Sequence, residues 1–358
     1  MKKTPFVLIA FLCAGIICAG ESELAKAKKN GTKALFKYAQ KLEKSKKYEE
    51  AIEVYYDIIA SEKNIAVIQD ARIKSSKAKA RSKDYGGAIH DLQNVLAMKE
   101  KYPKTGLSYY QTAIMDLAHI YSSRMGNYAG AIELLDNAMA DKGFAFAKKR
   151  FQQKKESLLQ EQVKKLAAIQ KFDEARKLAA ENLKKMPGKT SIASMVNTET
   201  AYGKWLTSRK KFAEADQVLR AAAKLQGAPA EIYWNVQEAI LFNQIIKRNI
   251  AEAQKELEKL KKMPGNPGTR IVMAEARLLF IFEKNQELVN LFVQAANDPK
   301  FKPKEQGNFY AEAAFYAVSR LKNIKLSEEY YEKAKSLMGK KYRNPRVEKS
   351  LNFWRTKL

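Results

Sequence analysis

A single spacing of apolar residues recurs along the chain. An apolar, usually aromatic residue is followed three positions later by a small residue, and further apolar residues stand four and seven positions beyond it. The first copy shows this pattern at Tyr48, Ala51, Tyr55 and Ile58. Intervals of three and four place such side chains on one face of a helix. Each copy therefore predicts an amphipathic helix.

The pattern occurs in eight copies, which makes it an internal repeat. The copies begin at Lys46, Lys83, Gly126, Gln170, Lys210, Arg248, Lys284 and Lys322. Their small residues are Ala51, Ala88, Ala131, Ala175, Ala215, Ala253, Val289 and Ser327. A second amphipathic segment precedes the copies, for example over residues 34–42, 116–121 and 200–206. The repeated unit is thus predicted to be a helical hairpin, and hairpins this short must stack on each other to bury their apolar faces.

Helix-ending signals divide the chain at the same period. The segment Lys-Lys-Met-Pro-Gly occurs at residues 184–188 and again at 261–265. Proline and glycine just past a helix end stop the helix, and lysines in its last turn complement the negative end of its dipole. No long linker rich in glycine, serine or proline interrupts residues 21–358, and no segment alternates for long with period two. We predict one continuous all-α domain over residues 21–358.

The hairpin pattern resembles the tetratricopeptide repeat family, most clearly in the fifth unit. The family's first-helix positions are filled there by Tyr202, Gly203 and Leu206, and its second-helix positions by Phe212, Ala215, Leu219 and Ala222. The seventh unit departs from the pattern, with Gln286 at the aromatic position and Val289 at the small one, and the eighth has Ser327 after a less clear first helix. The resemblance implies a right-handed α-solenoid of about eight hairpins.

In that family the first helices line a concave face, so the resemblance also projects which side chains point inward. The ninth residue of each unit is Gln40, Lys77, Lys164, Lys204 and Phe242 in units one, two, four, five and six. In the third unit the count falls on Ile120, and we take the polar His119 beside it. These six residues are the candidate partner-binding site, with the lysines forming a basic ladder for a peptide or an acidic side chain. The alternative is that they are ordinary solvated lysines in a lysine-rich chain.

The N-terminus predicts export. Lys2 and Lys3 precede an apolar run over residues 6–19, which is followed by small residues and a polar stretch. This is typical of a secretory signal peptide, here residues 1–20, and the run is too short for a permanent transmembrane span. Ile17 before Cys18 disfavours a lipoprotein signal. We therefore expect a protein of the bacterial periplasm or cell envelope, or a secreted one.

Few residues suit catalysis or metal binding. Cys13 and Cys18 both belong to the apolar run, so the mature chain has no thiol, and His90 and His119 stand in different units. No glycine-rich phosphate loop, nucleophile elbow or zinc-binding His-Glu-x-x-His pattern is present. We predict no enzyme activity, no cofactor and no metal site.

The charge indicates acidic partners. The full chain carries 66 basic and 39 acidic residues, a net charge of +27. A field of that sign accelerates encounters with acidic proteins, anionic lipid headgroups or anionic polymers. The alternative is that the net positive charge has no specific ligand and reflects solvated lysines at helix ends or a generally basic proteome. The export signal and the absence of a reading motif disfavour nucleic acid.

Two hypotheses follow from these observations. The first is a non-catalytic scaffold of the bacterial cell envelope that holds a partner protein or peptide on its first-helix surface. The alternative is a basic protein attached to an anionic envelope polymer or lipid.

Overall fold

The computed structural model describes residues 22–265, 267–339 and 341–357. Over these residues it contains helices, turns and bends, and no strand. The chain divides into two compact units, one ending at Leu159 and the other beginning at Gln160. The predicted signal peptide and both cysteines lie outside the described residues. Among the described helices, none has the length and hydropathy needed to cross a bilayer.

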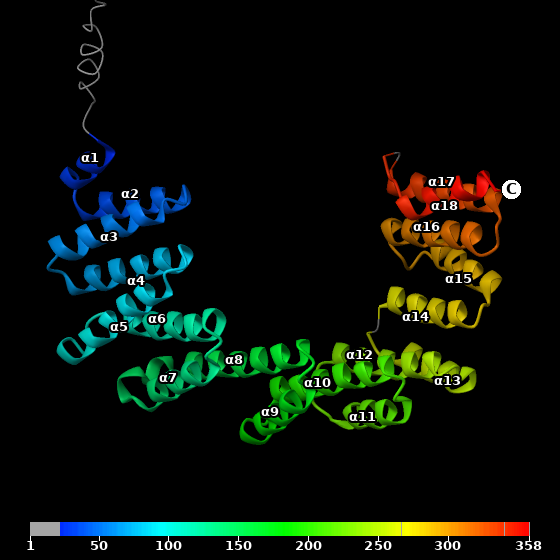
Figure 1. Ribbon diagram of the computed structural model, residues 1–358, viewed down its shortest axis with the longest axis horizontal. Coiled ribbons are helices and arrows are strands. Elements are labelled where there is room, and N and C mark those ends of the chain that lie inside the picture. Colours follow the sequence, from blue (N-terminus) through cyan, green and yellow to red (C-terminus); the bar gives the residue numbers. More distant parts are fainter. Residues whose placement is uncertain (1–21, 266, 340, 358) are drawn as a thin grey trace, which may run out of the picture. The chain divides into compact units, whose positions relative to one another are not determined.

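Helices alternate between two roles along the chain (Figure 1). The first helices are α2 (Thr32–Lys44), α4 (Ile65–Arg81), α6 (Leu107–His119), α8 (Lys148–Ala168), α10 (Lys189–Ser208), α12 (Ala230–Ile246), α14 (Gly268–Ile281) and α16 (Pro303–Ser319). The second helices are α3 (Tyr48–Ser61), α5 (Tyr85–Lys101), α7 (Tyr128–Ala140), α9 (Phe172–Lys185), α11 (Phe212–Lys224), α13 (Ile250–Lys262), α15 (Asn285–Asn297) and α17 (Ile324–Met338). Each of the eight sequence repeats therefore supplies one second helix.

Shorter elements complete the array. Helix α1 (Glu23–Lys29) packs on α2, and α18 (Pro345–Arg355) packs on α16 and α17. A π-helical turn, η1 (Ile120–Arg124), continues α6, and a 3₁₀ segment, η2 (Lys142–Ala147), precedes α8. The boundary between the two units falls within α8.

Every turn inside a hairpin has the same backbone geometry. One residue in each turn has a positive φ between 56° and 71°, two positions before the second helix begins. These residues are Lys46, Lys83, Gly126, Gln170, Lys210, Arg248, Glu283 and Lys322. The next amide donates back to a carbonyl five residues earlier in six of the turns, as from Lys47 to Leu42 at 2.9 Å. This is the Schellman arrangement, which satisfies the free carbonyls at a helix end.

The turns correct the predicted alignment of the seventh unit. Its left-handed residue is Glu283, one position before the predicted start at Lys284. Counting five residues on, as from Lys46 to Ala51, puts Leu288 and not Val289 at the small position. Both side chains are fully buried. The sequence alignment was misled because the turn residue here is acidic and the helix opens with a polar Asn285.

The third and eighth units each contain one extra residue before the turn. In the third, the amide of Asn127 donates to Tyr121, six residues back, and the π-helical turn η1 accommodates the insertion. In the eighth, the amide of Asn323 donates to Ala317, also six residues back. The insertion shifts the third unit's ninth position from Ile120 to His119. Accordingly Ile120 is 4% exposed, whereas His119 is exposed.

The small residues lie where helices cross. All eight predicted small positions, from Ala51 to Ser327, are 0% exposed. The first helices carry a matching close contact. A Cβ on Gly203 of α10 would come within 2.5 Å of Leu219 on α11, so only glycine permits this spacing. The prediction of an all-α array of tetratricopeptide-like hairpins is confirmed.

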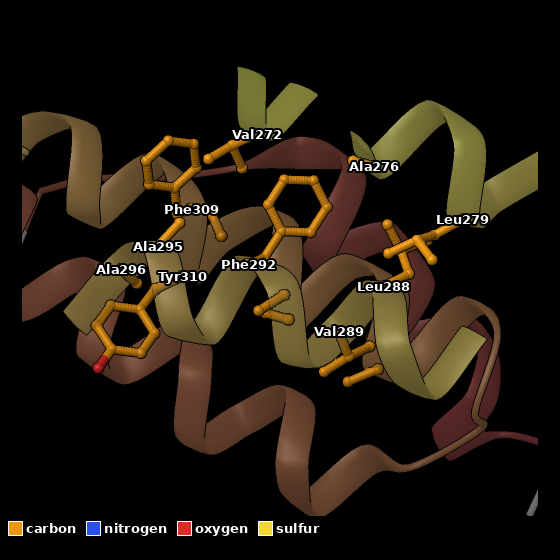
Figure 2. Close-up of a cluster of buried hydrophobic side chains, with 14 of the residues drawn as sticks. Val272, Ala276, Leu279, Leu288, Val289, Phe292, Ala295, Ala296, Phe309 and Tyr310 are labelled. Carbon is orange, nitrogen blue, oxygen red and sulfur yellow. The ribbon is translucent and has the colours of Figure 1, made fainter. Parts of the chain in front are cut away.

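The apolar core runs between neighbouring hairpins. In the second unit a large cluster extends from α12 to α18. Figure 2 shows Phe292 of α15 in this cluster together with Val272 of α14 and Phe309 and Tyr310 of α16. The ring of Phe292 stacks on Tyr316 at 5.7 Å and an interplanar angle of 3°. Each hairpin thus depends on the next for its buried surface, as expected for a repeat protein.

Two buried charge clusters tie three helices together, one in each unit. In the first unit, Asp91 of α5 is 0% exposed and accepts hydrogen bonds from Tyr56 of α3 and Ser75 of α4, at 2.9 and 2.7 Å. Lys79 of α4 lies 2.9 Å from the same carboxylate. Burial would lower the pKa of Lys79, but its bonds to Tyr56 and Asp91 raise it. Charge and hydrogen bonding thus compensate for desolvation here.

The second cluster surrounds Glu256 of α13, which is also 0% exposed. Gln237 of α12 donates to it at 2.6 Å, Lys259 at 2.8 Å, and Arg220 of α11 lies 3.0 Å away. Burial alone would raise the pKa of Glu256. Hydrogen bonds from Lys259, Gln237 and Arg220 outweigh it and hold the pKa below its usual range.

Candidate functional site

The predicted site residues all lie on first helices and are all exposed. Gln40, Lys77 and His119 belong to α2, α4 and α6 in the first unit, and Lys164, Lys204 and Phe242 belong to α8, α10 and α12 in the second. Measured from the left-handed turn residue, five of them are six positions upstream. His119 is seven upstream because of the π-helical insertion. They are therefore equivalent positions of the repeat.

In the first unit the neighbouring helices modify two of these side chains. Lys77 lies 3.4 Å from Asp116 of α6, one helical turn before His119, so part of its charge is neutralised. His119 Nδ1 lies 3.2 Å from the hydroxyl of Ser123. The first-unit surface therefore combines an amide, an ion-paired lysine and an imidazole, and it is less basic than a ladder of free lysines would be.

The second unit presents a mixed basic and apolar surface. The first helices α10, α12 and α14 pack in order, α10 against α12 and α12 against α14. Lys204 stands on α10 and Phe242, 38% exposed, stands on α12. With the corrected register, Arg277 occupies the equivalent position on α14 and is exposed. Met273, 40% exposed, lies one helical turn before Arg277 on the same face.

Arg277 and Met273 are the residues that sequence reasoning missed. The ninth residue was counted only through the sixth unit, and counting six positions back from the predicted start at Lys284 would have given Leu278. The sequence signal that could have found Arg277 is the turn before α15. If the second helix is allowed to begin with the polar Asn285, Glu283 takes the turn position that Lys46 and Lys210 hold in other units. We refer to Lys204, Phe242, Met273 and Arg277 as the first-helix surface.

A groove lies on the opposite side of α10 from Lys204. It has a volume of about 450 Å³ and is lined by α9, α10 and α11. Met195, Glu199, Tyr202 and Leu206 line it from α10 at intervals of three and four, so Lys204, two residues from Tyr202, points to the other face. The structure thus separates this groove from the predicted binding residues.

One ion pair organises that groove. Arg176 of α9 donates to Glu199 at 2.8 Å, and Glu199 is 7% exposed. The guanidinium also lies over the ring of Tyr202, 4.6 Å from its centroid. Tyr202 in turn stacks on Trp205 at 5.8 Å, and the Trp205 indole donates to Gln170 at 3.1 Å. Trp205 therefore packs the α9–α10 junction, and Arg176 already has a carboxylate partner.

Similar grooves recur at the same place in other repeats. One of about 550 Å³ is lined by α1, α2 and α3, and one of about 380 Å³ by α13, α14 and α15. Val54, Val218 and Leu291 are equivalent lining residues, each eight positions after the turn residue. The grooves are therefore a product of hairpin packing and not a site built around one ligand.

The residues that could support catalysis are dispersed. His90 lies on α5 and His119 on α6, and both are exposed. Within the part of the chain that the structure describes, no group of three or more histidine, cysteine, aspartate or glutamate side chains is arranged to hold a metal ion. Glu256, a buried carboxylate whose pKa is lowered, is held by Gln237, Arg220 and Lys259 inside a helix junction.

Comparison with known proteins identifies similar folds only. No family model matches the chain, and no curated protein sequence does. Among solved structures, it is similar to a tetratricopeptide repeat protein from Parabacteroides merdae, with 13% identity over 80% of this chain and 98% of that one, at a TM-score of 0.37. It is also similar to the apo quorum sensor NprR from B. thuringiensis, with 14% identity, 85% and 86% coverage and a TM-score of 0.35.

A third similar structure is yeast Tom70, with 16% identity over 93% of this chain and 80% of that one, at a TM-score of 0.26. Of these three, the Parabacteroides merdae protein is described as a tetratricopeptide repeat protein. Identities and TM-scores this low carry no argument about the partner, the location or the activity of this chain.

Proposed function

We propose that this chain is a non-catalytic scaffold that holds a partner protein or peptide on the first-helix surface of its second unit. The observation that supports this best is the exposure of Phe242 and Met273 on packed helices that also carry Lys204 and Arg277, two exposed cations with no ion pair to a carboxylate of the described residues. Large apolar side chains at the exposed positions of packed helices do not contribute to the core of the chain. Aromatic and methionine side chains flanked by charge are typical of protein-binding surfaces.

The chemistry of that surface defines the partner. A segment that carries an apolar residue near acidic residues would cover Phe242 and pair with Lys204 and Arg277. Arginine can hold a carboxylate through two parallel hydrogen bonds, and lysine adds a point charge. The scaffold would therefore bind an acidic, amphipathic peptide and act by presenting it, without turning it over.

Site-specific photo-crosslinking tests this proposal. A photoreactive residue placed at 204, 242 or 277 of the full chain should capture one and the same partner from the producing cells. The control position is Ile250 of α13, which is 44% exposed but lies on a second helix. Equal capture from position 250, or different proteins from the three test positions, would count against a defined first-helix site.

Affinity measurements with the captured partner give a second test. Phe242→Ala should weaken binding by about tenfold or more, the usual effect of truncating a buried aromatic at an interface. Ile250→Ala should leave the affinity within about twofold of wild type. A loss that is the same for both variants would show that the proposed surface is not where the partner sits.

We also propose export to the bacterial cell envelope, on the basis of the N-terminal pattern over residues 1–20. Removal of this segment takes away Lys2 and Lys3 and leaves a strongly basic mature chain. Mass spectrometry of the protein from fractionated cells should find an N-terminus near Gly20 in the envelope or secreted fraction. Recovery of the uncleaved chain in the cytoplasm would refute export.

A further inference from the structure

The two edges of the second unit differ in charge. Consecutive helices run in alternate directions, so the turns within hairpins gather at one edge and the turns between hairpins at the other. We define the between-hairpin edge by residues 183–191, 223–231, 259–265, 267–270, 296–305, 335–339 and 341–346. The within-hairpin edge comprises residues 166–174, 206–214, 244–252, 279–287 and 317–326.

Most of the positive charge lies on the between-hairpin edge. Its described residues include 15 basic and 3 acidic side chains, against 10 basic and 6 acidic on the within-hairpin edge. The difference has a local origin, because lysines in the last turn of each second helix complement the helix dipole. Because the same preference recurs in each hairpin, the lysines together form a basic edge along the second unit.

The cations of the between-hairpin edge fall into two groups. Its three arginines are all paired within the protein: Arg270 with Glu238 at 2.8 Å, Arg343 with Glu348 at 3.6 Å, and Arg346 with Glu312 at 3.1 Å. Eight exposed lysines form no ion pair with a carboxylate of the described residues. These are Lys184, Lys185, Lys189, Lys224, Lys262, Lys302, Lys304 and Lys341. The charges left free for a ligand are therefore all lysine ammonium groups.

We propose that this edge binds a linear polymer of phosphate groups. Lysine is a hydrated, rotatable point charge, which suits a flexible anionic chain better than a rigid bidentate ligand. The free lysines occur at every between-hairpin turn of the unit, so successive hairpins can engage successive stretches of one polymer. Each engaged phosphate releases condensed counterions, and these contributions accumulate along the chain.

The same edge is poorly suited to other anionic partners. Leu337, at 37% exposure, is the one exposed large apolar side chain among its described residues. Insertion into a bilayer uses several apolar anchors, and single-stranded nucleic acid uses exposed aromatic rings on which bases stack. With one exposed apolar anchor among its described residues, the surface therefore fits the backbone charge of a polymer better than it fits bases or acyl chains. This inference is independent of the peptide surface, which lies on the first-helix faces.

Matched charge variants of the full chain test the proposal. The edge variant combines Lys184→Gln, Lys185→Gln, Lys262→Gln and Lys304→Gln. The control combines Lys210→Gln, Lys247→Gln, Arg248→Gln and Lys325→Gln, which removes the same charge from the within-hairpin edge. All eight side chains are exposed, so circular dichroism and urea unfolding should match wild type for both variants.

The measurement is the Kd for labelled long-chain inorganic polyphosphate across a series of salt concentrations. The Kd of the edge variant should be higher than that of wild type by about tenfold or more. The slope of log K against log salt should become shallower by about 3, because four phosphate contacts are lost. The control should lose less than about threefold in affinity. If both variants lost affinity equally, net charge alone would explain the binding and the proposal would be overturned. Binding to vesicles rich in phosphatidylglycerol without binding to polyphosphate would overturn it in favour of a membrane.

Discussion

The left-handed turns make a prediction of unusual sign, because replacing a lysine by glycine should stabilise the protein. Lys210 has a φ of 61°, a region that is strained for side chains with a Cβ. That strain amounts to about 1–2 kcal/mol. Glycine removes it but gives the unfolded chain more freedom, which costs about 0.4–1 kcal/mol. Lys210→Gly should therefore raise the free energy of unfolding by about 0.5–1 kcal/mol.

The effect should add across hairpins. Arg248 has a φ of 60° in the turn of the next hairpin. Stability in repeat arrays is approximately a sum over repeats and their interfaces. The double variant Lys210→Gly with Arg248→Gly should gain about 1–2 kcal/mol, which corresponds to a rise in Tm of roughly 2–8 °C for a unit of this size.

Three controls separate backbone strain from charge. Lys210→Ala removes the same charge but keeps the strained φ, so its stability should stay near that of wild type. Lys211→Gly changes the next residue, whose φ is −84°, and should lower stability. Gly126→Ala, at a φ of 68°, should destabilise by about 1 kcal/mol. Urea and thermal unfolding followed by circular dichroism measure all of these. If Lys210→Ala gains as much as Lys210→Gly, repulsion between lysines is the cause and the strain argument is wrong.

Three further predictions concern buried contacts. Gly203→Ala should lower the free energy of unfolding in urea by about 1–3 kcal/mol, because the added Cβ would overlap Leu219. The control is Gly86→Ala in α5, where the nearest atom to the added Cβ is 3.9 Å away, and it should be neutral or stabilising by up to about 1 kcal/mol. The depressed pKa of Glu256 contributes stability above the unfolded-state value near 4.5, which is lost as pH falls through the lower folded value. Glu256→Gln should therefore flatten the acid side of the stability profile below about pH 4.5, and an unchanged slope would exclude Glu256 as a source. Asn243, 0% exposed, donates to the Phe212 carbonyl at 3.0 Å, so Asn243→Ala should cost about 1–3 kcal/mol in the same assay, and a neutral result would mean that water replaces the bond.

The fold could be predicted from the sequence because its determinants are local and repeated. Ala51, Ala131 and Ala215 stand at a fixed distance from a turn and from apolar residues, and all three are fully buried. Because the pattern occurs eight times, an alignment error in one copy does not change the predicted fold. The seventh unit shows the limit: Leu288 and Val289 are both buried, so hydrophobicity alone could not choose between them, and only the backbone of Glu283 did.

The candidate site was less predictable because it depends on contacts between units. The sequence placed Lys77 on a first helix, but its ion pair with Asp116 arises from the packing of α4 on α6. Arg277 was missed because the ninth residue was counted only through the sixth unit, and the one-residue error in the seventh would have given Leu278 in its place. The claim that these residues bind a partner stays a prediction, since exposure is necessary for binding but does not establish it.

The extra residue in the third hairpin has an evolutionary consequence. The π-helical turn at Ile120–Arg124 accepts an insertion within a helix while the following turn and second helix keep their geometry. In an unbroken α-helix, one inserted residue would rotate the side chains before it by roughly 100° against those after it. The π-helical turn absorbs that rotation, so α6 keeps the same face toward its neighbours, with Ile120 buried and His119 exposed. A gene for such an array can therefore gain a codon beside a turn without losing the packing of the hairpin on either side.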